Sequence, residues 1–252
     1  MNVALVCLHG WGGSKESFTE LRAALQGKDM EIFTPDLPGF GDEPEPSRPW
    51  TTDDYANWVL EYLRKNNLLD RDLILLGHSH GGRILIKLLS RKTSNEQRST
   101  IRATRLILCA AAGIRHPRHL KRILGLTLAK TGAFFLAIPG MRQLRPLGKK
   151  FLYRLVRVHD YERASPIMRE TLILVSREDV RPLLSNIHIP TDIFWGTDDR
   201  MTPVADAHVM HRAISGSRLH LFPGRHAVHR ERAREIAAML FPAHASDANR
   251  SA

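Results

Sequence analysis

The chain has 252 residues, 43% of them hydrophobic and 25% charged, which is typical of a globular protein large enough for one sizeable domain. No apolar run approaches the roughly 20 residues that cross a bilayer. No signal-peptide pattern opens the sequence, and Cys7 and Cys109 are too few for a disulfide framework, so we expect a cytoplasmic protein.

Strands and helices alternate along the sequence. Apolar runs predict strands at 3–8, 32–33, 73–76, 105–112, 191–195 and 218–222. Helical spacing of apolar residues predicts helices at 18–25, 55–63 and 84–89, after Pro203 and at 233–240. This alternation is typical of a mainly parallel sheet that is covered by helices on both faces.

The stretch "GHSHG", residues 77–81, joins a predicted strand to a predicted helix. Gly77 and Gly81 lie two residues on either side of Ser79, which gives the pattern G-x-S-x-G. On such a sharp turn the serine hydroxyl is held above the edge of the sheet, and small neighbours let strand and helix approach closely. The pattern and its context favour Ser79 as a catalytic nucleophile.

A serine nucleophile needs a base, and the base needs an acid that orients it. Asp198 and Asp199 follow the strand at 191–195, and both are candidates for the acid. His226 is the first histidine after the strand at 218–222 and is the preferred base, while His229 is the weaker candidate. The carboxyl ends of parallel strands share one edge of a sheet, so these residues can meet there.

Backbone N–H groups must stabilise the oxyanion of an acyl-transfer intermediate. We expect one donor at His80, directly after the nucleophile, and the other at Trp11 in the glycine-rich loop "HGWGG". Histidines at 9, 78 and 80 raise the alternative of a metal site, but no Asp, Glu or Cys joins them at ligand spacing, so we expect no metal. Substrate-binding residues are not assigned by the pattern, and the candidates are His9, Gly10, Phe134 and Phe135.

The blocks "HGWGG", "DLPGFG", "GHSHGG", "GTDDRMTP" and "GRHAVHRERAREI" resemble, in order, those of α/β-hydrolase superfamily serine hydrolases. In that family's G-x-x-D-x-x-x-P block the acid is the fourth residue, which corresponds to Asp199, with Asp198 as the second choice. The resemblance implies an α/β-hydrolase sheet without the family's usual N-terminal hairpin, hence about six strands. It also implies a core domain at 1–112 and 187–242.

Residues 113–186, here called the cap, break the alternation of strands and helices. By resemblance the cap is a helical insertion that covers the active site, and a disordered tail is expected at 243–252. Between 113 and 165 twelve lysines and arginines stand against Asp160 and Glu162 alone, which accounts for most of the net charge of +11. A solvated exterior is the preferred interpretation; weak attraction to an anionic lipid or substrate is the alternative. No nucleic-acid recognition motif accompanies the charge.

These residues indicate a serine hydrolase that needs no cofactor and acts on a small-molecule acyl substrate. The preferred function is a carboxylesterase for small or medium acyl groups. Cleavage of a carbon–carbon bond in a vinylogous diketone is the alternative within the same chemistry, and a non-catalytic receptor on the same fold is the alternative outside it. Acyl length, physiological substrate and oligomeric state do not follow from the sequence.

Overall fold

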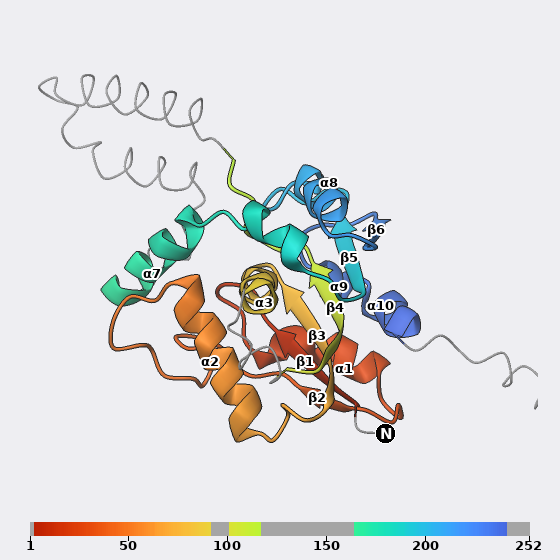
Figure 1. The fold of residues 1–252 in the computed structure, drawn as a ribbon, viewed down its shortest axis with the longest axis horizontal. Coiled ribbons are helices and arrows are strands. Elements are labelled where there is room, and N and C mark those ends of the chain that lie inside the picture. Colours follow the sequence, from red (N-terminus) through yellow and green to blue (C-terminus); the bar gives the residue numbers. More distant parts are fainter. Residues whose placement is uncertain (1–2, 92–100, 117–163, 241–252) are drawn as a thin grey trace, which may run out of the picture.

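The computed structural model describes residues 3–91, 101–116 and 164–240. Their centre is a six-stranded sheet with the order β2-β1-β3-β4-β5-β6, and every neighbouring pair is parallel (Figure 1). The strands are β1 (Val3–Leu8), β2 (Glu31–Phe33), β3 (Asp72–His78), β4 (Ala103–Cys109), β5 (Thr191–Gly196) and β6 (Arg218–Phe222). The fold class predicted from the sequence is therefore confirmed.

Helices cover both faces of this sheet (Figure 1). One side carries α2 (Thr52–Lys65), α3 (His80–Ser90) and α8 (Val204–Ala213), and the other carries α1 (Thr19–Ala24), α9 (Val228–Glu231) and α10 (Ala233–Leu240). The central strands are buried from both sides, and every residue from Ala4 to Leu8 is inaccessible to solvent. This explains why these strands are continuous apolar runs rather than alternating ones.

The strand order reverses beside β1, because β2 lies on one side of it and β3 on the other. In open parallel sheets such a reversal separates the loops that leave the carboxyl ends of the strands and creates a crevice between them. The loops that follow β1 and β3 flank this point. They carry the predicted oxyanion loop and the predicted nucleophile.

Two element boundaries differ from the prediction. The strand expected at 105–112 ends at Cys109, because Ala110 has a φ of 46° that turns the chain out of the extended conformation. The helix expected at 18–25 is divided into a 3-10 helix at Lys15–Phe18, which Ser14 caps, and the short α1.

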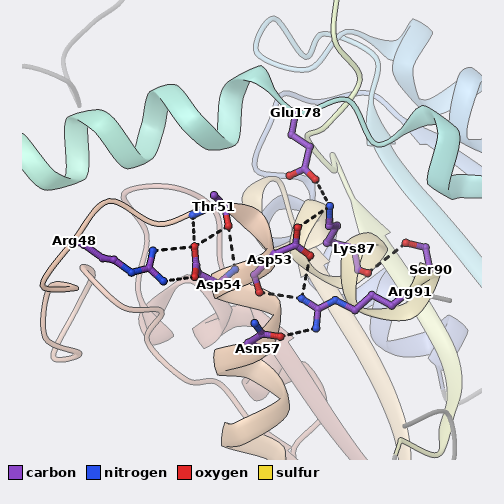
Figure 2. Close-up of polar contacts among 9 residues, drawn as sticks. All are labelled: Arg48, Thr51, Asp53, Asp54, Asn57, Lys87, Ser90, Arg91 and Glu178. Atoms are coloured by element: carbon purple, nitrogen blue, oxygen red, sulfur yellow. Dashed lines mark hydrogen bonds and ion pairs between the residues drawn. The ribbon is translucent and has the colours of Figure 1, made fainter. Parts of the chain in front are cut away.

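The described part of the cap contains two helices, α7 (Pro166–Arg177) and a 3-10 helix at Arg181–Asn186, while residues 113–116 are not helical. A polar cluster joins the end of α7 to the core, because Lys87 of α3 contacts both Asp53 of α2 and Glu178 (Figure 2). The rest of the cap, 117–163, and the tail at 243–252 lie outside the described residues, so the division into domains stays a prediction. In the described ranges no helix is both long and apolar enough to span a bilayer.

Candidate active site

Ser79 stands on a sharp turn between β3 and α3, with φ 49° and ψ −110°. Its N–H donates to the carbonyl of Cys109 at 3.0 Å and its carbonyl accepts from Ala112 at 2.9 Å, which ties the turn to the end of β4. A Cβ on Gly77 would lie 2.6 Å from the Cα of Gly82. A Cβ on Gly81 would overlap the carbonyl of Leu8. The glycines around Ser79 are therefore required by close backbone approach, as the sequence pattern predicts.

The two predicted oxyanion donors lie in neighbouring loops. The carbonyl of His9 accepts from the N–H of Gly81 at 3.1 Å, and the rings of Trp11 and His80 lie 5.5 Å apart. Within the described residues, the backbone N–H groups of Trp11 and His80 donate to no acceptor. His80 is also the first residue of the eleven-residue α3, where unpaired N–H groups and the helix dipole favour negative charge. This corner of the sheet can therefore accept an anion.

His9 and Gly10 directly precede Trp11 in the loop after β1, and their contacts fix the conformation of this loop. The N–H of Leu37 donates to Nε2 of His9 at 2.9 Å, so the proton of this imidazole is on Nδ1, which donates to the carbonyl of Gly10 at 2.8 Å. Burial lowers the pKa of His9, so the ring stays neutral at pH 7. A Cβ on Gly10 would lie 3.1 Å from the Cβ of Ser79, which places this glycine directly beside the serine.

Asp199 and His226 come together at the carboxyl ends of β5 and β6. Nδ1 of His226 donates to Oδ2 of Asp199 at 2.7 Å, and the Asp199 side chain is fully buried. Asp198, the second candidate for the acid, is exposed and contacts the segment after β6 through its backbone N–H. The structure thus brings Asp199, and not its neighbour, against the imidazole.

Thr202 completes the surroundings of the carboxylate. Its hydroxyl donates to Oδ2 of Asp199 at 2.8 Å, and the N–H groups of Met201 and Thr202 donate to Oδ1 at 2.7 and 3.1 Å. Burial acts to raise the pKa of Asp199, but the bonds from His226, Thr202 and Met201 outweigh it and hold this pKa below its ordinary value. The carboxylate is therefore ionised at neutral pH and accepts the Nδ1 proton of His226, and no residue in the described ranges forms a hydrogen bond to Nε2.

His78 links the serine turn to the loop that carries His226. Nε2 of His78 donates to the backbone carbonyl of His226 at 3.1 Å, and the two rings lie 4.8 Å apart. Burial lowers the pKa of His78 well below its ordinary value, so this ring is a neutral donor. In the described part of the chain no hydrogen bond joins the Ser79 hydroxyl to His226. Contacts between nucleophile and base are often long without substrate and tighten when it binds.

Sequence reasoning missed the roles of Thr202 and His78 in this arrangement. Both were present in the motifs, Thr202 three residues after the acid and His78 directly before the serine, but the patterns gave no reason to single them out.

His229, the weaker candidate for the base, lies on α9. Its ring is buried 3.8 Å from that of His78 and 5.4 Å from that of Phe18. It is not in contact with Asp199.

Among the described residues no group of three or more His, Cys, Asp or Glu side chains could hold a metal ion. His9 uses both ring nitrogens in hydrogen bonds within its own loop region. Phe134 and Phe135, the cap candidates for substrate binding, lie outside the described residues. The structure thus places a serine on a strained turn, two neighbouring loops with unpaired backbone N–H groups and a carboxylate–imidazole pair at one edge of the sheet.

Two relatives match most of the chain. The chain is similar to a pimeloyl-[acyl-carrier protein] methyl ester esterase of Neisseria meningitidis, 26% identical over 232 residues that cover 84% of this chain and 81% of the relative. It is also 26% identical over 245 residues to an uncharacterized protein of Mycobacterium tuberculosis, covering 88% of this chain and 69% of the relative.

Solved structures share the fold. An esterase from Exiguobacterium antarcticum superposes with a TM-score of 0.68 at 24% identity, covering 95% of this chain and 90% of the esterase. An enol-lactonase from Burkholderia xenovorans LB400 gives the same TM-score at 20% identity, with coverage of 95% and 90%. The model of the alpha/beta hydrolase family matches residues 5–239, nearly the whole chain. The chain therefore belongs to the alpha/beta hydrolase family.

Proposed function

We propose that this hydrolase cleaves carboxylic esters of small-molecule acyl substrates through a covalent acyl–enzyme on Ser79. In this proposal His226 is the general base, Asp199 orients it, and the backbone N–H groups of Trp11 and His80 form the oxyanion hole. The observation that carries the proposal is the pairing of His226 with a buried, ionised Asp199 at the same sheet edge as a serine with φ 49°.

The reaction begins when Oγ of Ser79 attacks the ester carbonyl carbon and passes its proton to Nε2 of His226. The Nδ1 proton of His226 stays in the hydrogen bond to Asp199, which stabilises the imidazolium without taking the proton. The tetrahedral intermediate then collapses. The C–O bond breaks, and the alkoxide leaves with the proton that His226 returns.

A water molecule then repeats the sequence on the acyl–enzyme. His226 takes a proton from the water, the hydroxide adds to the acyl carbon, and Ser79 leaves with its proton restored. In both halves the negative charge develops on the former carbonyl oxygen, beside the unused N–H groups of Trp11 and His80. Each such donor contributes roughly 3 kcal/mol to lowering the barrier. The positive end of α3 adds to this stabilisation.

The ester class is supported by two kinds of evidence. The serine, carboxylate and imidazole follow one another along the chain, each on a loop after a strand, in the order that acyl-transfer enzymes of this fold use. A relative that is similar over most of its length is described as a methyl ester esterase.

A fluorophosphonate probe tests the nucleophile, because it reacts with an activated serine and not with an inert one. We expect a single adduct on the peptide that contains Ser79, and no adduct in Ser79→Ala. The matched control is Ser185→Ala, which alters an exposed serine outside the site and should label like the wild type. An adduct elsewhere, or labelling that persists in Ser79→Ala, would reassign the nucleophile.

The bond that is cleaved is tested with p-nitrophenyl esters of graded acyl length beside a vinylogous diketone. We expect turnover of the esters that depends on Ser79, with one preferred chain length. Turnover of the diketone without turnover of the esters would assign carbon–carbon cleavage. An unlabelled, inactive wild type would indicate a receptor on a hydrolase fold.

A further inference from the structure

A hollow of about 410 Å³ borders His226 on the surface of the described chain. Its walls come from two loops, the one after β5 and the one after β6. The lining residues are Asp198, Arg200, Met201, Arg225 and His226. Asp199, which contacts His226, is buried behind this surface.

The side chains of the two arginines in this hollow have no described ion-pair partner, although the backbone N–H of Arg225 donates to Glu231 at 3.1 Å. Neither Arg200 nor Arg225 forms an ion pair or a side-chain hydrogen bond with any described residue. Four exposed arginines elsewhere are paired with carboxylates: Arg48 with Asp54, Arg64 with Glu61, Arg181 with Asp179 and Arg230 with Glu20. Others, such as Arg22, Arg177 and Arg212, are also exposed without a described ion pair. Arg200 and Arg225 differ from these because both line the same hollow. Asp198 is the one carboxylate in the lining, so the hollow has an excess of one positive charge.

Met201 gives the same hollow an apolar surface, since this residue is 66% exposed. An exposed methionine in the same lining as the two arginines offers dispersion contacts to the carbon skeleton of a ligand, while the arginines offer hydrogen bonds to its oxygen atoms. A planar guanidinium fork matches the oxygen pair of a carboxylate or phosphate. The chemistry of the lining thus fits an organic anion better than a neutral molecule.

The hollow is lined by His226 and not by Ser79, Trp11 or His80. In the proposed function His226 returns its proton to the leaving alkoxide, so the alcohol part of the ester lies on the side of the imidazole. We propose that the hollow is a subsite for a carboxylate or phosphate group on the alcohol portion of the substrate. This inference rests on the proposed function and specifies its substrate class.

Two matched esters test the subsite. In 4-acetoxybenzoate the leaving group carries a carboxylate, and in 4-acetoxybenzamide the corresponding group is neutral. The measured quantity is the ratio of kcat/KM for the anionic ester to that for the neutral one. Because each enzyme variant is given the same two esters, their intrinsic reactivities cancel when variants are compared.

We expect Arg200→Gln and Arg225→Gln each to lower this ratio about two- to fivefold, and the double variant to lower it further, as is usual for exposed charge pairs. Asp198→Asn should raise the ratio, because it removes the opposing charge. The control is Arg212→Gln, an exposed arginine of α8 that does not line the hollow, and it should leave the ratio unchanged. Added salt should lower the ratio of the wild type and have little effect on the double variant.

Product inhibition gives a second measurement of the same subsite. We expect 4-hydroxybenzoate to inhibit the wild type more strongly than 4-hydroxybenzamide does, and the double arginine variant to lose this difference. An unchanged kcat/KM ratio in the double variant at low salt would overturn the subsite, even with normal turnover of the neutral ester. p-Nitrophenyl hemisuccinate carries its carboxylate on the acyl side, and p-nitrophenyl acetate is its neutral counterpart. If the double arginine variant lost preference for the hemisuccinate while its ratio for the two acetoxy esters stayed unchanged, the anion would lie on the acyl side and the assignment would be overturned. Failure of Ser79-dependent turnover for all of these esters would overturn the proposed function as well.

Discussion

Two buried aspartates lie near opposite ends of β5, and each contacts a histidine from the segment that contains β6. Asp192, at the start of the strand, is bonded to His220 at 2.9 Å. Asp199, three residues beyond the end of the strand, is bonded to His226 at 2.7 Å. The two pairs are alike in composition and in sequence spacing, but their other partners differ.

Asp192 is surrounded by cations. Arg105 of β4 and Arg218 of β6 both form ion pairs with it, at 2.6 and 2.9 Å. Asp199 has no arginine or lysine among its described partners, and its further donors are the neutral Thr202 hydroxyl and two backbone N–H groups. A carboxylate that is already neutralised serves to hold three strands together. A carboxylate whose described partners are an imidazole and neutral donors can, in the proposed function, stabilise the charge that this imidazole gains during the reaction.

Asp199→Asn should have the largest effect of the substitutions that test the difference between the two aspartates. An amide in place of the carboxylate disfavours the Nδ1-protonated form of His226 and cannot stabilise the imidazolium. We expect kcat to fall about ten-thousandfold, as loss of the orienting carboxylate does in other serine hydrolases. Steady-state hydrolysis of p-nitrophenyl acetate measures the loss. Asp198→Asn is the matched control and should change turnover of this neutral ester little; the opposite ranking would make Asp198 the acid.

Asp192→Asn should have the opposite effect from Asp199→Asn: it should lower the stability of the fold and change kcat little. The substitution leaves Arg105, whose side chain is only 18% exposed, without its carboxylate. We expect the free energy of unfolding to fall by about 3 kcal/mol. Urea denaturation measures it, and kcat per folded molecule should stay near that of the wild type. A stable variant with a large loss of kcat would mean that the two aspartates are not functionally distinct.

The pH dependence of stability offers a second test of the Asp192 cluster. Burial acts to raise the pKa of Asp192, but the hydrogen bonds from His220, Arg218 and Arg105 outweigh it and lower this pKa. A carboxyl group whose folded pKa lies below its unfolded value contributes stability above the unfolded value, near 4, and this contribution disappears as the pH falls through the folded pKa. The wild type should therefore lose more stability than Asp192→Asn on acidification below about pH 4. Parallel losses in both proteins would contradict the cluster's role.

Thr202→Val tests the neutral donor that distinguishes Asp199 from Asp192. Valine keeps the shape of the side chain and removes the hydroxyl that donates to Oδ2. We expect kcat/KM to fall about tenfold, the usual effect of losing one hydrogen bond to a charged group. Thr202→Ser restores the hydroxyl and should recover most of the activity. If Val and Ser variants are equally impaired while equally stable, packing of the methyl group, rather than the hydrogen bond, matters at this position.

The sequence allowed the fold to be predicted because the strands of a doubly covered parallel sheet are continuous apolar runs. The turn around Ser79 could be predicted because its glycines are required by backbone contacts between adjacent elements. The boundary at Ala110 could not, since a positive φ at alanine has no signal in composition.

The polar contacts of Asp192 and Asp199 could not be predicted from the sequence patterns either. Arg105, Asp192 and Arg218 come from three different strands, and their meeting depends on the register between β4, β5 and β6. A charged residue at the start of a strand is usually exposed, so nothing marked Asp192 as buried. The bond from His78 to the His226 carbonyl likewise joins residues that are 148 positions apart.

Arg218→Gln should have the smallest effect, because Arg218 is the most exposed of the partners of Asp192. The Arg218 side chain is 63% exposed, so solvent and salt screen its attraction to Asp192, whereas Arg105 and His220 still contact the carboxylate after the substitution. We expect a loss of less than about 1 kcal/mol in the free energy of unfolding, as is usual for exposed ion pairs, with normal turnover. The loss should shrink further when urea denaturation is repeated at high salt. A loss as large as that of Asp192→Asn would mean that Arg218 holds the carboxylate alone, and that Arg105 and His220 contribute little to joining the three strands.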